Sequence, residues 1–173
     1  RAVAPRDDRE FKGLADAVVA GMAKVGATVH LLGLTTTPFF TFCFNKLGVA
    51  GGIMVTASHN PPQYGGFKVY GKDGNLIALD SGLAVLKGLI DNGSEAISAR
   101  VAAGPGKVQP VERGRRLEEY VNFAIGRVKF SGANLLSIPI SITGPYTAND
   151  EIKLFKTKLG LIDAAQPILS FNF

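Results

Sequence analysis

The chain has 173 residues, of which 46% are hydrophobic and 19% are charged, and this balance excludes an intrinsically disordered protein. Its 21 Gly and 9 Pro residues follow no Gly-X-Y repeat, which excludes a collagen-like chain, and no apolar stretch reaches the roughly 18 residues of a membrane span. The single cysteine, Cys43, excludes an intrachain disulfide framework. The formal charge of +5 favours acidic partners in general: phosphorylated metabolites, nucleic acid, anionic lipid or acidic proteins.

Helical and strand patterns alternate through the first part of the chain. Residues 9–26 carry apolar side chains at the i, i+3, i+4, i+7 spacing of an amphipathic helix, which ends at Gly26. Residues 28–32 and 52–56 are short apolar runs with β-branched residues and predict two buried strands. Between these strands, residues 39–47 predict a short apolar helix that ends before Gly48.

A hairpin and a third helix are predicted next. Residues 67–70 and 76–79 predict two short strands, joined by the sequence KDGN at 72–75, because Asp-Gly tolerates the positive φ of a hairpin turn. Asp80 or Ser81 can cap a helix that runs to residue 92. Helices that alternate with strands, together with one hairpin, predict an α/β fold with a mixed sheet between helices.

The second part of the chain has a different composition. Residues 94–110 are rich in Ala, Gly and Pro and predict a linker. Beyond it, residues 111–128 predict a helix, residues 135–142 a strand, and a last helix runs from 149 or 150 to 159. Domains below about 40 residues rarely fold alone and those near about 60 are marginal, so these elements are too few for a core of their own.

We therefore divide the chain into a first domain at 1–93, a linker at 94–110 and an incomplete second α/β domain at 111–173. We expect the incomplete domain to pack on the first domain, on further sequence or on another protein, because a lone strand would leave its backbone edges unpaired.

One loop carries the residues with the most chemistry. Thr56-Ala57-Ser58-His59-Asn60-Pro61 presents a hydroxyl beside an imidazole and an amide at the end of a predicted strand. Lys68 adds a cation that can neutralise a phosphate or exchange a proton. Ser, His and Lys around a proline-stiffened loop suit phosphoryl transfer, in which positioning and charge stabilisation dominate. The alternative is an ordinary polar turn in which Ser58 and Asn60 bond to the backbone.

The six residues TASHNP, followed by Gly-Phe-Lys-Val-Tyr at 66–70, resemble the phosphoserine loop of the α-D-phosphohexomutases, the phosphoglucomutase and phosphomannomutase family. The sequence PRDDR at 5–9 is similar to the strand-end motif before that family's first long helix, and TTTP at 35–38 is similar to the loop before its short helix. Residues from 111 onward resemble the crossing into the family's second domain. The resemblance is close over 9–92 and looser after 104.

The resemblance implies a mechanism. In the family the loop serine carries a phosphoryl group, donates it to the 1- or 6-hydroxyl of a sugar and regains one from the resulting bisphosphate. Carried over, Ser58 is the phosphoryl carrier, Lys68 is a candidate general acid/base, and His59 positions the loop or exchanges protons. Asn60 and Arg9 are substrate-binding candidates, with a structural role as the alternative for Arg9. The phosphate on Ser58 would be one ligand of Mg²⁺, a hard cation that prefers oxygen.

The sequence also departs from the family. The metal loop Asp-Gly-Asp-x-Asp-Arg and the sugar-selecting loop Gly-Glu-x-Ser/Ala-Gly do not occur in the 173 residues, and Gly65 stands where the family usually has Asn. A full mutase has four domains, whereas this chain corresponds to the first and the start of the second. We therefore expect Mg²⁺ binding through Ser58 only if the metal loop is supplied, and no turnover of sugar phosphates by the chain alone.

Two functions of different classes follow. The first is a shortened mutase-like domain that serves as a structural, accessory subunit and binds other protein subunits through its incomplete second domain. The alternative is the N-terminal part of an active phosphoglucomutase or phosphomannomutase that acts on hexose phosphates through Ser58. A phosphosugar-binding regulatory module is a third possibility. The family resemblance implies a cytoplasmic protein, whereas an accessory subunit with a processed N-terminus and basic charge fits a mitochondrion.

Other chemically notable residues are expected to be structural. His30 lies in an apolar strand and predicts a core or boundary histidine, and Cys43 predicts a small core residue. The basic residues are spread along the chain and predict a solvated or partner-facing surface, so no nucleic-acid partner is expected. The aromatic residues of the short apolar helix are expected to pack in the core or against a partner, rather than to stack on bases: Phe39, Phe40, Phe42 and Phe44.

Overall fold

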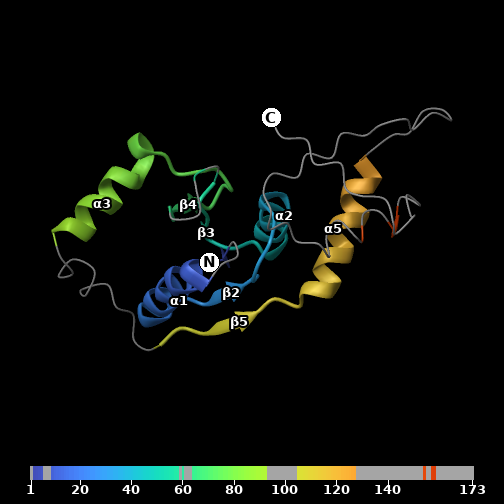
Figure 1. Cartoon of the computed structure of the whole chain (residues 1–173), viewed down its shortest axis with the longest axis horizontal. Coiled ribbons are helices and arrows are strands. Elements are labelled where there is room, and N and C mark those ends of the chain that lie inside the picture. Colours follow the sequence, from blue (N-terminus) through green and yellow to red (C-terminus); the bar gives the residue numbers. More distant parts are fainter. Residues whose placement is uncertain are drawn as a thin grey trace. The chain divides into compact units, whose positions relative to one another are not determined.

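Five short strands form one mixed sheet in the computed structural model, which describes residues 2–5, 9–58, 60, 64–92 and 105–127, together with Leu154, Thr157 and Lys158. The strand order is β4-β3-β1-β2-β5, with β4 antiparallel to β3 and every other neighbouring pair parallel (Figure 1). This confirms the predicted α/β class and mixed sheet. The strands are β1 (Ala2–Pro5), β2 (Val29–Leu31), β3 (Gly52–Val55), β4 (Phe67–Tyr70) and β5 (Val108–Pro110).

The chain divides into two units, Arg1–Val111 and Glu112–Phe173. The first unit holds the sheet with α1 (Arg9–Lys24), α2 (Thr37–Leu47), a π-helical turn η1 (Leu79–Leu83) and α3 (Ala84–Asp91). The second unit contains α5 (Arg113–Arg127). The domain boundaries drawn from composition stay a prediction.

Helices α1 and α2 lie on opposite faces of the sheet. Successive side chains of a strand point to opposite faces, and β3 shows this directly. Ile53 and Val55 pack with side chains of α1, whereas Gly52 lies against two phenylalanines of α2. The strand order explains the arrangement: β1 to β2 steps one way across the sheet and β2 to β3 steps back, so right-handed crossovers place the two connecting helices on opposite faces.

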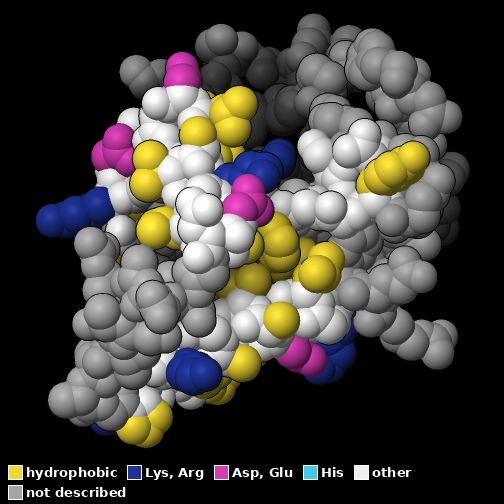
Figure 2. Space-filling view, turned by 90° about the vertical axis from the view of Figure 1, so that its left-hand side faces the viewer, with side chains coloured by type: hydrophobic (Ala, Val, Ile, Leu, Met, Phe, Trp, Pro, Cys, Tyr) yellow, Lys and Arg dark blue, Asp and Glu magenta, His cyan; other side chains and the backbone are white. Residues whose placement is uncertain are grey.

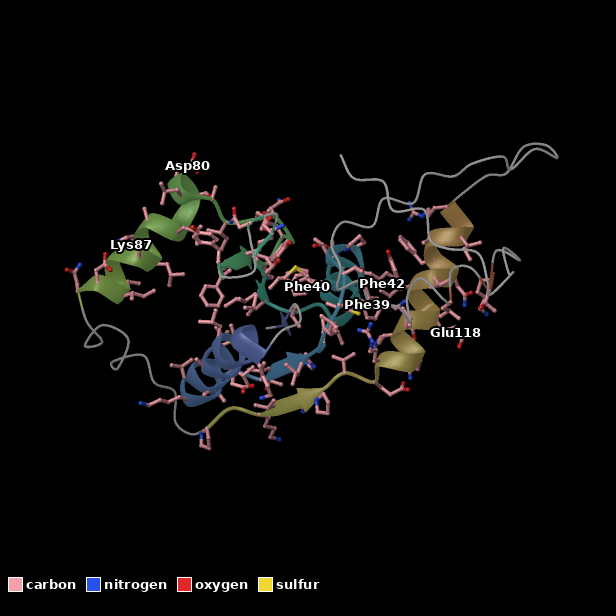
Figure 3. The ribbon with its side chains drawn as sticks, viewed as in Figure 1. Phe39, Phe40, Phe42, Asp80, Lys87 and Glu118 are labelled. Atoms are coloured by element: carbon pink, nitrogen blue, oxygen red, sulfur yellow. The ribbon has the colours of Figure 1, made fainter. Side chains whose placement is uncertain are left out.

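Helix α2 forms the most densely buried part of the first unit. Phe39, Phe40, Cys43 and Phe44 are all buried, and the ring centroids of Phe40 and Tyr70 are 4.9 Å apart. Figure 3 shows Phe40 on the side of α2 that faces β3 and β4. The predicted core roles of these side chains are confirmed.

The ends of α2 follow from its sequence. The Thr36 hydroxyl accepts a hydrogen bond from the Phe39 amide at 3.4 Å, Pro38 occupies the first turn, and Gly48 adopts a left-handed conformation with φ 59°. Such a hydroxyl cap satisfies an amide that has no partner within the helix, and a glycine reaches positive φ without steric cost.

The prediction of a second hairpin strand at 76–79 is wrong. The turn itself forms, with Gly74 at φ 80°, but only Leu76 makes a bridge, to Tyr70. The Ala78 amide donates to the Ser81 hydroxyl at 2.8 Å, which removes that amide from strand pairing. The chain then enters η1, so neither Asp80 nor Ser81 caps a helix that begins there, and α3 starts at Ala84.

The predicted linker contains a strand at its end. Residues 108–110 form β5, which pairs in parallel with β2. The Val29 amide donates to the Lys107 carbonyl at 2.7 Å, and the Gly106 amide donates to the Ala23 carbonyl at 2.7 Å. These partners are far away in the sequence, so the pairing leaves no local signal in the short, proline-containing stretch.

The predicted helix at 111–128 is confirmed as α5 (Arg113–Arg127), with Leu117 and Val121 buried. Lys158 forms an ion pair with Glu118 of α5 at 3.2 Å. Leu154, Thr157 and Lys158 are helical, as predicted for 150–159. The predicted strand at 135–142 lies outside the described residues.

Helix α3 buries none of its side chains. Its apolar residues lie at the surface instead, with Val85 69% and Ile90 65% exposed, and Figure 2 shows hydrophobic side chains on the side of the molecule that carries α3. Lys87, labelled in Figure 3, pairs with Asp91 on the polar side of α3.

No helix in the described part of the chain is long and apolar enough to cross a membrane.

The close packing of Gly52 against α2 generates a stability prediction. A Cβ at this position would lie 2.8 Å from Cζ of Phe40 and 3.0 Å from Cδ2 of Phe44. Because both rings are buried, Gly52→Ala is expected to lower the free energy of unfolding by about 1–3 kcal/mol in urea denaturation. The matched control is Gly13→Ala in α1, where a Cβ meets nothing within 4 Å; it should raise the free energy of unfolding by about 0.5–1 kcal/mol. Equal effects at the two positions would contradict the packing.

The position of His30 generates a pH prediction. Partial burial in β2 lowers the pKa of His30 from its ordinary value of 6.5, so the unfolded chain binds a proton more readily than the folded chain. The free energy of unfolding should therefore decrease as the pH falls through 6.5 toward the lower pKa of the folded state. Denaturation between about pH 7 and about pH 5 should show a weaker pH dependence in His30→Gln. An unchanged slope in that variant would contradict the assignment.

Candidate functional site

The site predicted from the sequence lies at the carboxyl edge of the sheet. Because β1, β2 and β3 are parallel to one another, their carboxyl ends meet at the same edge. Pro5 and Val55, the last residues of β1 and β3, are paired directly. In the sheet, β2 is the neighbour of β1 on one side and β3 is its neighbour on the other side, so the strand order reverses at β1. In open α/β sheets, ligands bind where the strand order reverses in this way.

The loop that contains Ser58 leaves β3 at this point. The Thr56 amide donates to the Gly66 carbonyl at 2.9 Å, which closes the base of the loop. The Ser58 amide donates to the Thr56 hydroxyl at 3.0 Å, and the Asn60 amide donates to the Ala57 carbonyl at 3.0 Å. Local hydrogen bonds thus hold the chain in a tight turn around Ser58.

Ser58 has an unusual backbone conformation. Its φ is 58°, and it is the one non-glycine residue in the described part of the chain with a positive φ. This region is disfavoured for residues with a Cβ and is found preferentially at turns and functional sites. The alternative interpretation, an ordinary polar turn, is compatible with the hydrogen bonds and with the positive φ, so the role of Ser58 stays a prediction.

Lys68 lies in β4, next to the strand that leads into the loop. It is paired across the sheet with Met54, so the two side chains share a face. The Thr37 hydroxyl at the start of α2 donates to the Met54 sulfur at 3.5 Å. The half-buried Lys68 therefore lies on the face that α2 covers, near the beginning of that helix.

Two helices begin at the same edge. Helix α1 starts at Arg9, four residues after the end of β1, and α2 starts at Thr37 after β2. Helix N-termini carry a partial positive charge, which favours an anion nearby. Together with Lys68, they make the potential at this edge suitable for a phosphate group.

The other predicted site residues are placed less completely. Asn60 is exposed in the loop, and Arg9 is the first residue of α1, with its side chain outside the described set. His59 is also outside the described residues. The structure thus brings Ser58, Asn60 and Lys68 to one region of the sheet, and the roles assigned to all five residues stay predictions.

Thr56 is a residue whose role the sequence analysis missed. It is 8% exposed and connects the end of β3 to the Ser58 turn through its own hydroxyl. The signal was present as the spacing Thr-x-Ser, since a threonine hydroxyl often bonds to the amide two residues further on.

The described residues alone do not fit a Mg²⁺ site. Their His, Cys, Asp and Glu side chains form no group of three or more that could hold a metal ion. A phosphate on Ser58 would supply oxygen ligands of the kind that Mg²⁺ prefers, but the carboxylates of a full site would have to come from elsewhere.

The sequence model of the phosphoglucomutase/phosphomannomutase alpha/beta/alpha domain I matches residues 5–96, a range that contains the strands β3 and β4 and the Ser58 loop. The chain belongs to this family. The match begins at the end of β1 and ends just beyond α3.

Individual relatives agree with the family assignment. The chain is 36% identical over 123 residues to a phosphoglucosamine mutase of Geobacillus kaustophilus. The aligned region covers 70% of this chain and 27% of the relative. It is 51% identical over 61 residues to a phosphoglucosamine mutase of Prochlorococcus marinus, covering 35% of this chain and 13% of the relative. The chain thus spans about a quarter or less of the length of these curated relatives.

A solved structure shares the fold. A phosphoglucomutase/phosphomannomutase family protein of Burkholderia thailandensis superposes with a TM-score of 0.55 at 28% sequence identity. The superposition covers 76% of this chain and 28% of that protein. Sequence and structure comparisons therefore agree on the family.

Proposed function

We propose that this chain is the phosphoserine-bearing part of a phosphohexomutase and that Ser58 carries the phosphoryl group. The observation that carries the proposal is the left-handed turn at Ser58, held at the carboxyl edge where β1 and β3 end. The relatives are phosphoglucosamine mutases, so a hexosamine phosphate is the proposed substrate. Conversion of this substrate would also require the residues that make up the other three-quarters of such a mutase.

The proposed transfer follows from the chemistry of the site. The sugar hydroxyl forms a bond to phosphorus as the bond between phosphorus and the Ser58 oxygen breaks. The proton of the sugar hydroxyl passes, by way of Lys68, to the Ser58 oxygen as that oxygen leaves, so serine is released as its hydroxyl. In the second half-reaction the Ser58 oxygen forms a bond to the other phosphorus of the bisphosphate as the bond from that phosphorus to the sugar oxygen breaks. The proton then passes from Ser58, again by way of Lys68, to the departing sugar oxygen.

The other candidate residues would support the transfer. We assign His59 to positioning of the loop or proton exchange, and Asn60 and Arg9 to contacts with the substrate. Mg²⁺, bound in part through the Ser58 phosphate and in part through residues beyond this chain, would supply electrostatic stabilisation of the phosphoryl oxygens.

A second candidate function is a structural one. Helix α3 exposes Val85 and Ile90 to solvent, and an apolar helix face at a surface is typical of an interaction site. An accessory subunit would cover this face with another protein and would need no phosphate on Ser58.

Variants of Ser58 and Lys68, with a lysine control, test the proposed function in the full-length protein that its source produces. Ser58→Ala should abolish the interconversion of hexosamine 6-phosphate and 1-phosphate, and Lys68→Ala should lower kcat by about 10²–10⁴-fold, as expected for loss of a general acid/base. The matched control is Lys72→Ala, because Lys72 is exposed in the turn after β4. Full activity of Ser58→Ala would contradict the proposal and favour the accessory role.

A further inference from the structure

The conformation of Ser58 requires a compensating interaction. A residue with a Cβ enters the left-handed region only at a steric cost, and Ser58 has a φ of 58°. The Asn60 amide, which bonds to the Ala57 carbonyl at 3.0 Å, closes the turn on one side of Ser58. The hydrogen bond between the Ser58 amide and the Thr56 hydroxyl closes it on the other side.

Thr56 is well suited to hold this turn because it cannot move easily. Its residue is 8% exposed, and its amide bonds to the Gly66 carbonyl at 2.9 Å. A Cβ on Gly66 would lie 3.5 Å from the Thr56 carbonyl oxygen, so the two ends of the loop are in close contact. The hydroxyl that accepts from the Ser58 amide therefore belongs to a residue that is anchored at the end of β3.

We propose that Thr56 is a positioning residue for phosphoryl transfer: its hydroxyl holds the Ser58 amide and keeps Ser58 in the left-handed turn that presents the phosphoryl carrier to substrate. This inference rests on the proposed function of Ser58. Thr56 contacts neither substrate nor phosphate in this role. It acts through the backbone of Ser58, at the end of β3.

The role has a kinetic consequence. Ser58 must give a phosphoryl group in one half-reaction and receive one in the other, so the same oxygen has to be oriented for both steps. Loss of orientation slows transfer without removing a contact with the sugar, and the loss should therefore appear in kcat rather than in KM.

Two variants distinguish the effect of the Thr56 hydroxyl from the effect of the shape of the side chain. Thr56→Val keeps the branched shape that suits a buried strand end but removes the acceptor, whereas Thr56→Ser keeps the acceptor and removes a methyl group. In the full-length protein we expect kcat to fall about five- to tenfold in Thr56→Val with KM nearly unchanged, the size expected for one lost hydrogen bond. Thr56→Ser should stay within about twofold of the unaltered protein.

Hydrogen exchange of the Ser58 amide provides a second readout. Exchange should be about tenfold faster in Thr56→Val than in Thr56→Ser, because only the valine variant frees this amide. Equal exchange, an unchanged kcat in Thr56→Val, or an equal loss of kcat in both variants would overturn the inference. Failure of the proposed function is distinguishable: Ser58→Ala would then remain active whatever the exchange rates are.

Discussion

Parallel pairing of β3 with β1 determines where the Ser58 loop lies in this chain. The register aligns Pro5 with Val55, so β1 and the strand that leads into the Ser58 loop end side by side. The pairing also places α1 and α2 on opposite faces, and both helices start at the same edge. The loop, the lysine on β4 and two helix N-termini converge because β1 and β3 are neighbours.

Hydrogen bonds within the loop fix the position of the Ser58 backbone. A buried threonine anchors the Ser58 amide to the end of β3, and the bond between the Thr56 amide and the Gly66 carbonyl leads the chain into β4. Lys68 follows at once on the adjacent strand. A rigid presentation of this kind would suit the proposed role of Ser58 as a phosphoryl carrier, since preorganised positioning dominates such transfers.

Elements with strong local patterns could be predicted from the sequence. Helix α1 has apolar spacing along one face, α2 combines a threonine cap with a glycine end, and β2 and β3 are short apolar runs. The prediction failed where distant contacts decide the structure. Strand β5 depends on pairing with β2, and the second hairpin strand is lost because the Ser81 hydroxyl binds the Ala78 amide.

The site was predictable to a similar extent. The TASHNP sequence predicted a loop with Ser58 after β3, and the pattern that follows it predicted that Lys68 lies on the next strand; the roles of both residues stay predictions. The left-handed backbone of Ser58 could not be predicted, because no sequence signal marks positive φ at a serine as glycine marks it at a turn. Nor could the face occupied by Lys68, since that depends on the cross-strand register with Met54.

The most direct test of the account is intact mass spectrometry, with fragmentation, of the protein isolated from its source without overexpression. The account predicts a phosphate on a fragment that contains Ser58, within a polypeptide several times heavier than 18.2 kDa. An 18.2-kDa chain released from a larger particle, with Ser58 unmodified, would contradict it and establish the structural role instead.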